Sequence, residues 1–160
     1  MLHINIVCVG KIKEKYLKDA ITEYSKRLSR FCKLNIVELS DEKIPDSASK
    51  ATEEIIKNKE GQNILSHLDS GSYIIALDLA GKQYTSTELS QKIDNIASST
   101  NSNITFIIGG SLGLSKDVLC KCNELISFSK LTFPHQLIRV FLLEQLYRSF
   151  KILNNETYHK

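Results

Sequence analysis

Hydrophobic positions along this chain alternate between two spacings, one typical of strands and one typical of helices. Short β-branched or continuously apolar runs predict five strands, at residues 3–9, 33–39, 72–78, 103–108 and 125–129. Apolar residues at helical spacing, together with helix-start signals, predict five helices, at residues 15–31, 51–68, 85–98, 115–122 and 134–153. The regular alternation predicts an α/β fold with a mostly parallel sheet and helices on both of its faces.

The last predicted helix has an apolar stripe too wide for a helix with one face in water. Ten residues between Leu137 and Ile152 are apolar. Either another segment buries this helix or it packs on a second subunit, and we expect a homodimer. Three charged residues lie within the stripe: Arg139, Glu144 and Arg148. Glu144 and Arg148 are four residues apart, a spacing that allows them to pair.

Length and composition are those of an ordinary globular protein. The 160 residues suffice for one domain, 1–160, with a single core. No run approaches the roughly 20 apolar residues that a membrane span needs. The apolar run at residues 4–9 is too short for a signal-peptide core, so we expect a cytoplasmic protein with no membrane contact. Because the four cysteines lack the usual zinc spacing, we expect reduced thiols and no metal.

The net charge of +3 does not by itself indicate a nucleic-acid partner, but the charge is unevenly distributed. Residues 1–33 carry eight Lys and Arg against three acidic residues, and residues 130–160 carry five against two. The middle, 34–129, carries eight against thirteen. If the basic ends meet in space, they form a positive patch suited to phosphates. The alternative is an ordinary solvated helix face.

Two loops are candidates for ligand binding. The glycines at Gly109, Gly110 and Gly113 follow a buried strand, at the sheet edge where α/β proteins bind ligands. A glycine turn that binds no ligand accounts for these residues equally well. Their spacing fits neither a dinucleotide-binding fingerprint nor a P-loop. In the second loop, 127–135, apolar side chains can pack on an adenine while the backbone reads its edge. An ordinary strand–helix connection accounts for Pro134 but leaves Leu131 and Phe133 facing solvent.

Several short motifs, in order, resemble one known family, the ribosomal RNA large subunit methyltransferase H family. The resemblance runs from Ile6 to the last residue, and the ordered set is far more specific than any single motif. The motifs are Val9-Gly10-Lys11, Lys59-Glu60-Gly61, Leu77-Asp78, Gly81-Lys82, Ile108-Gly109-Gly110, Phe128-Ser129, Phe133-Pro134-His135, Arg139, Glu144-Gln145-Leu146-Tyr147-Arg148 and Tyr158-His159-Lys160.

The resemblance implies a SPOUT-class fold with a C-terminal trefoil knot, from about residue 72 to 160, in a homodimer. It also implies S-adenosyl-L-methionine as the methyl donor, bound in a bent form by the knot loops. Carried over to this sequence, the cofactor residues are Leu77, Gly109, Gly110, Phe128, Ser129, Lys130, Leu131, Thr132, Phe133 and Pro134.

The substrate implied by the resemblance is a pseudouridine in helix 69 of 23S ribosomal RNA, methylated at N3 on the assembled ribosome. The candidates for removing the imide proton, or for stabilising the imidate, are Arg148, Tyr158, His159 and His135. We expect Arg148 and the Tyr158-His159 tail of the dimer partner to form the nucleotide pocket. The alternatives are an idle, frayed tail and a capping role for His135.

Two other functions compete with methyl transfer. One is a non-enzymatic RNA-binding or ribosome-associated factor that uses the same basic ends, and it predicts no cofactor binding. The other is a flavodoxin-like or nucleotide-binding enzyme, which predicts a phosphate cradle after the first strand, where Gly10 stands alone.

Overall fold

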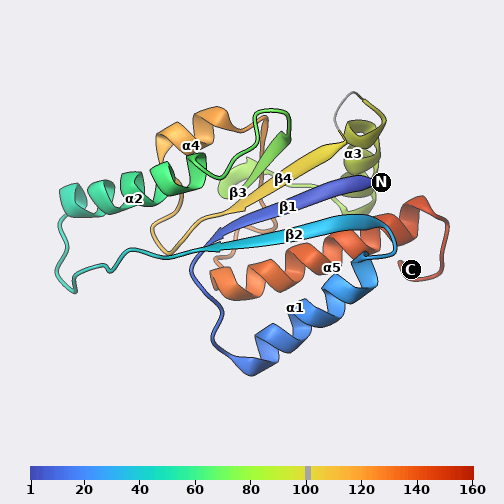
Figure 1. Cartoon of the computed structure of the whole chain (residues 1–160), viewed down its shortest axis with the longest axis horizontal. Coiled ribbons are helices and arrows are strands. Elements are labelled where there is room, and N and C mark those ends of the chain that lie inside the picture. The colour runs from blue at the N-terminus through green and yellow to red at the C-terminus, as the bar shows by residue number, and fades with distance from the viewer. Residues whose placement is uncertain (100–101) are drawn as a thin grey trace.

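A computed structural model describes residues 1–99 and 102–160, which form a five-stranded, all-parallel sheet between two layers of helices (Figure 1). The strand order is β2-β1-β4-β3-β5. The strands are β1 (Leu2–Val9), β2 (Cys32–Leu39), β3 (Tyr73–Lys82), β4 (Asn103–Ile108) and β5 (Glu124–Ile126). The predicted α/β class and the parallel sheet are confirmed.

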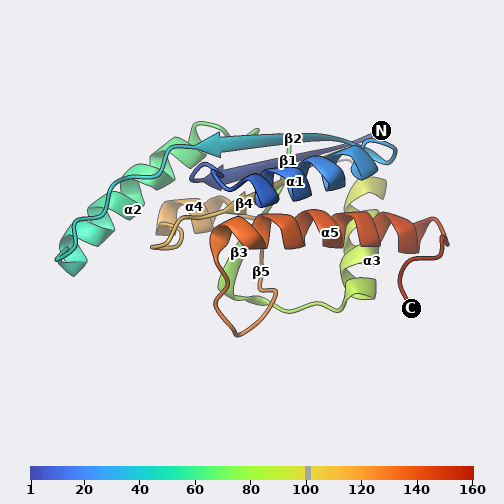
Figure 2. The same cartoon turned by 90° about the horizontal axis from the view of Figure 1, so that it is seen from below.

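Helices cover both faces of the sheet, as the alternating pattern predicts. On one face α5 (His135–Leu153) lies between α1 (Lys15–Leu28) and α3 (Ser86–Ser98). On the other face α2 (Lys50–Leu65) packs beside α4 (Lys116–Lys121) (Figure 2). Two buried clusters fill the space between the layers, one on each face.

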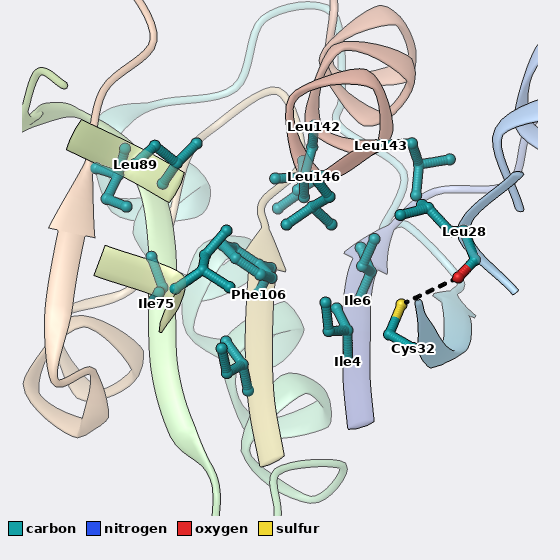
Figure 3. Packing of buried hydrophobic residues seen from close by; sticks show 14 of the residues in the cluster. Ile4, Ile6, Leu28, Cys32, Ile75, Leu89, Phe106, Leu142, Leu143 and Leu146 are labelled. Carbon is teal, nitrogen blue, oxygen red and sulfur yellow. Dashed lines mark hydrogen bonds between the residues drawn. The ribbon is translucent and has the colours of Figure 1, made fainter. Parts of the chain in front are cut away.

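The larger cluster explains why α5 is so apolar. Its residues Leu142, Leu143 and Leu146 are fully buried and face the β1 side chains Ile4 and Ile6 (Figure 3). Because α1 and α3 flank α5, much of its circumference is covered within one chain. Burial beneath other segments therefore accounts for most of the wide stripe, and the predicted homodimer stays a prediction.

Helix starts agree with the capping signals in the sequence. The Thr85 hydroxyl accepts a hydrogen bond from the Glu88 amide at 3.1 Å, and the Glu88 carboxylate accepts one from the Thr85 amide at 2.7 Å. The predicted capping box is thus confirmed. Ser115 caps α4, as predicted, through the amide of Val118.

Three predicted elements extended three residues past their observed C-terminal ends. The helix predicted to reach Phe31 ends at Leu28, because the chain turns there to start β2 and the Phe31 amide bonds to the Leu28 carbonyl. The helix predicted over 51–68 ends at Leu65. The strand predicted over 125–129 ends at Ile126, after which serine side chains bond to the nearby backbone and form a turn instead.

β3 is longer than predicted because it contains an irregularity. Leu77 and Lys82 both pair with Ile126 of β5, so residues 78–81 bulge out of the sheet between them. At Gly81 a β-carbon would lie 2.5–2.7 Å from backbone atoms of Leu125 and Ile126, so only glycine fits there. The bulge places residues 77–79 at the edge where the ends of β4 and β5 also lie.

Candidate active site

A cavity of about 550 Å³ opens at the carboxyl ends of β3, β4 and β5, and we call it the main cavity. It is lined by the end of β3, the glycine loop 109–113, the loop after β5 and the first turn of α5. Ligand sites of parallel α/β sheets lie at this edge. The predicted cofactor residues that line it are Leu77, Gly109, Gly110, Phe128, Ser129, Leu131, Thr132 and Phe133.

Two of the predicted cofactor residues are not among those that line the main cavity. Lys130 and Pro134 are both exposed, although they belong to the same loop. Loop geometry explains the difference: the Ser127 hydroxyl donates to the Ser129 carbonyl at 2.9 Å, and the Ser129 hydroxyl accepts from the Leu131 amide at 3.0 Å. This tight turn directs Lys130 outward. Leu131 lines the mouth of the cavity and stays 70% exposed, which matches the expected solvent-facing position.

The glycine loop leaves no room for side chains on its inner side. At Gly109 a β-carbon would lie 2.9 Å from Leu114, and at Gly110 it would lie 3.2 Å from Val9 and 3.3 Å from the Glu60 carboxylate. The loop backbone therefore packs directly against Val9, Glu60 and Leu114. Its other side faces the cavity and forms an open cradle there. Glu60 is buried, and burial raises the pKa of its carboxyl group.

His135, the first residue of α5, also lines the main cavity. Pro134 holds the cap position, with no side-chain cap bond, so the capping role considered for His135 is wrong. Burial and the nearby Arg139 guanidinium lower the pKa of His135, and Asp41 opposes them less strongly. The ring is therefore neutral at neutral pH and can accept a proton.

The other three catalytic candidates form a cluster at the far end of α5, which we call the tail cluster: Arg148, Tyr158 and His159. The Arg148 guanidinium lies 4.7 Å from the centre of the Tyr158 ring and 3.2 Å from Nδ1 of His159. Tyr158 also packs edge-on against Tyr147, with 5.0 Å between the ring centres. The chain end is held by these contacts and is not frayed, while its part in the chemistry stays a prediction.

Glu144 joins the tail cluster to a second cavity, and sequence reasoning did not include it among the site residues. Its Oε1 accepts hydrogen bonds from Nε of Arg148 at 3.0 Å and from the Tyr158 hydroxyl at 3.1 Å. Its Oε2 accepts one from Gln145, whose Oε1 accepts one from Ser86 at 2.8 Å. The pairing expected from the i, i+4 spacing of Glu144 and Arg148 is confirmed.

This second cavity, of about 300 Å³, is lined by Glu144 and Gln145 together with the start of α3. It shares four lining residues with the main cavity: Ile126, Ser127, Phe128 and Phe133. The two hollows are thus neighbours across the start of the loop after β5. No spacing motif in the sequence points to the residues around the start of α3 that line this cavity, Tyr84, Thr85, Ser86 and Leu89, because a contact between α3 and α5 is not visible in a local pattern.

The two basic ends of the chain meet, as the charge distribution allows. α1 packs along α5, and Arg30 pairs with Glu156 at 2.7 Å. The Arg27 guanidinium lies 5.7 Å from the centre of the Tyr147 ring. Arg27 and Arg30 therefore lie beside the C-terminal half of α5, and each is also paired with a carboxylate, Glu23 and Glu156 respectively. The positive patch for phosphates stays a prediction.

Within the described residues, no helix is long and apolar enough to cross a membrane. In the same part of the chain, no group of three or more His, Cys, Asp or Glu side chains is arranged to hold a metal ion.

A parallel α/β sheet with a glycine cradle at its carboxyl edge fits the class of protein that the sequence comparison identifies. The family model described as "Predicted SPOUT methyltransferase" matches residues 2–159. A solved structure with a similar fold is "a probable methylase family protein" from Haemophilus influenzae, with a TM-score of 0.55 and 16% identity. The match covers 98% of this chain and 70% of that one, and it supports the fold alone.

Relatives with high sequence identity identify the family within the SPOUT methyltransferases. The chain is 61% identical to a protein of Clostridium beijerinckii and 62% identical to one of Clostridium novyi, over 99% of this chain and 100% of each relative. Both are named "Ribosomal RNA large subunit methyltransferase H". The chain belongs to the ribosomal RNA large subunit methyltransferase H family of SPOUT methyltransferases.

Proposed function

We propose that this protein methylates N3 of a pseudouridine in helix 69 of 23S ribosomal RNA, with S-adenosyl-L-methionine as the donor. In this proposal it is a single-domain, cytoplasmic homodimer that acts on the assembled ribosome, with its knotted region at about 72–160. The observation that carries the proposal is the main cavity, in which eight of the ten predicted cofactor residues, from three separate segments, line one hollow.

The residues of the main cavity suit S-adenosyl-L-methionine. Leu77 and Phe128 supply apolar surface for an adenine, and the backbone of the 127–134 loop supplies polar groups for its edge. Gly109 and Gly110 let the main chain approach the ligand closely. The bound cofactor supplies a methyl group on a sulfonium, so the protein has mainly to position the acceptor and remove its proton.

The tail cluster suits the acceptor side of this chemistry. Hydrogen bonds to Glu144 raise the pKa of Arg148 further above its usual range, so its guanidinium stays charged and can stabilise an imidate. Burial and the Glu144 carboxylate raise the pKa of Tyr158 to about 12. Tyr158 is therefore a neutral donor at physiological pH and a poor base. The general base in this proposal is His159, with His135 as the alternative.

The distance along α5 explains why a partner subunit enters the proposal. Arg148 follows His135 by thirteen residues, which is about 20 Å at the usual helical rise. A tail cluster from the partner can meet the main cavity if the two α5 helices pack together. Phe141, on α5, is 42% exposed and is available for such a contact.

Mixing two inactive variants tests the shared site. One variant lacks residues 158–160. The other carries Gly110→Ala, whose β-carbon would press on Val9 and Glu60 on the inner side of the loop and displace the loop backbone that faces the cavity. Each alone should be inactive. If the partner completes the site, refolded mixtures should regain up to about a quarter of the wild-type activity, from a random mixture of subunits in which half of the dimers carry one intact site of two. Mixtures that stay inactive contradict a site shared between subunits. They leave the assignment of S-adenosyl-L-methionine to the main cavity unaffected.

Calorimetry with the purified protein separates methyl transfer from the two rival functions. The proposal predicts a stoichiometric S-adenosyl-L-methionine site, and transfer of labelled methyl to 23S RNA in ribosomes lacking the modification. A ribosome-binding protein without cofactor binding would support the non-enzymatic factor. The nucleotide-binding enzyme predicts a phosphate cradle after β1, where the Gly10 carbonyl instead accepts a hydrogen bond from Arg139.

A further inference from the structure

Arg139 is the largest fully buried side chain among the described residues, and it is charged. Its Nη1 donates to Oε2 of Glu38 at 2.7 Å, and its Nη2 donates to the Gly10 carbonyl at 2.9 Å. The same Glu38 oxygen accepts the Ile12 amide at 2.8 Å. A buried charge persists only where it is paired and hydrogen-bonded, so these contacts fix the Arg139 side chain in place.

The network ties three segments together at the carboxyl edge of the sheet. Glu38 comes from the end of β2, and Gly10 and Ile12 come from the turn after β1. Gly10 adopts φ +98°, a conformation that favours glycine, and this turns its carbonyl toward Arg139. Arg139 itself belongs to the first turn and a half of α5.

That part of α5 is also one anchor of the 127–134 loop. The loop leaves β5 at Ile126 and ends at Pro134, whose carbonyl accepts the Ile138 amide at 3.0 Å. Both His135 and Ile138 line the main cavity, and Arg139 is the next residue. A shift of the α5 start would therefore move the loop and two cavity walls together.

We propose that the Arg139–Glu38 pair is a positioning device that holds the start of α5, and with it the 127–134 loop, in the conformation that binds the methyl donor. Arg139 touches neither substrate nor donor; it acts through His135, Ile138 and the loop. This inference rests on the proposed assignment of the main cavity to S-adenosyl-L-methionine.

The shape of the network explains why arginine stands at this position. A planar guanidinium reaches the Glu38 carboxylate and the Gly10 carbonyl at the same time, whereas a lysine ammonium is a point charge on a flexible stem. Lysine keeps the charge and the pairing with Glu38 but not the fixed two-point geometry. Arg139→Lys therefore isolates the positioning role from simple charge neutralisation.

The test compares Arg139→Lys and Glu38→Gln with a control of lowered stability, Leu28→Ala. Leu28 is fully buried on α1 and does not line the main cavity. Each variant is characterised by its unfolding midpoint, its calorimetric Kd for S-adenosyl-L-methionine and amide hydrogen exchange in residues 127–134. We expect Arg139→Lys to weaken donor binding about tenfold and Glu38→Gln several-fold, from the loss of charge-assisted bonds. Loop exchange should rise in both.

Leu28→Ala should lower the unfolding midpoint while leaving the Kd and the loop exchange close to wild type. In turnover with ribosomes, the KM for the donor should rise in the two network variants more than kcat falls. If donor binding is unchanged in both network variants, or weakened equally by Leu28→Ala, the positioning role is wrong. The substituted amide oxygen can still accept from Nη1 of Arg139 and from the Ile12 amide, and position 38 is 38% exposed, so Glu38→Gln should fold even if Arg139→Lys does not. A wild-type protein that binds no donor would instead contradict the proposed function itself.

Discussion

The Arg148 guanidinium lies over the ring of Tyr158 at 4.7 Å, which fixes the last residues of the chain against α5. Both side chains also bond to one oxygen of Glu144. Ten residues apart in sequence, they form a single unit whose orientation depends on that carboxylate.

Glu144→Gln should therefore disable the tail cluster without affecting the donor site. Replacing a carboxylate by an amide weakens two bonds, and bonds to charged groups contribute about 1.5–3 kcal/mol each, so we expect kcat to fall at least about tenfold. The calorimetric Kd for S-adenosyl-L-methionine should stay within about twofold of wild type, because Glu144 does not line the main cavity.

The matched control is Glu156→Gln. Glu156 also holds two cations near the chain end, Arg30 and Lys151, but it does not contact Arg148 or Tyr158. It should change kcat little. Equal losses in the two variants would show that the chain end responds to any lost ion pair.

Deletion of residues 158–160 should abolish methyl transfer to ribosomes while leaving donor binding largely intact. The deletion removes Tyr158 and His159 from the tail cluster but no residue of the main cavity. A truncated protein that methylates ribosomes at the normal rate would show that the assignment of the tail is wrong. His159→Ala then tests the base separately, since loss of a base removes the lower limb of the pH–rate profile.

Gly81→Ala should destabilise the protein, because its β-carbon would lie within 2.7 Å of the β5 backbone. Backbone atoms cannot move aside as a flexible side chain can, so we expect a loss of about 3 kcal/mol in the free energy of unfolding, or failure to fold. Gly71→Ala is the control: its β-carbon would meet only Asp69 at 3.7 Å, and the change should stay within about 0.5 kcal/mol. Denaturant unfolding of both variants measures the difference.

The pKa of His135 should lie below 6.5, measured from the pH dependence of its ring signals by NMR. Because the folded pKa is lowered by burial and by Arg139, the unfolded chain binds more protons below pH 6.5. The contribution of His135 to stability is therefore fully present above pH 6.5 and is lost as pH falls from there through the folded pKa. His135→Gln should flatten this part of the pH–stability curve. A folded pKa at or above 6.5 would contradict the burial of the ring beside a cation.

Local pattern was sufficient for the order and type of every element, because apolar spacing reflects which face of each segment is buried. It was insufficient at the β3–β5 contact. Nothing near Gly81 in the sequence indicates that this residue lies against Ile126, 45 positions later, so the bulge and the long β3 were missed. Strand ends were misplaced where serine side chains competed for the backbone, as at Ser127.

The candidate site, like the fold, was predictable from the sequence only in part. The glycine loop and the loop after β5 stood out from their residues, but the resemblance to a known family was needed to assign them a common ligand. The roles of Glu144 and of the Arg139–Glu38 pair depend on contacts between distant segments. A charged residue in an apolar helix signals that a partner exists, and the sequence does not say which residue it is.

Mapping N3-methylpseudouridine in 23S ribosomal RNA tests the central claim most directly. Ribosomes from cells that lack this protein should carry an unmethylated pseudouridine in helix 69. The purified protein and S-adenosyl-L-methionine should restore the methyl group at N3 of that one residue. Normal methylation in the deletion strain, or transfer of the methyl group to a different nucleotide, would contradict the account.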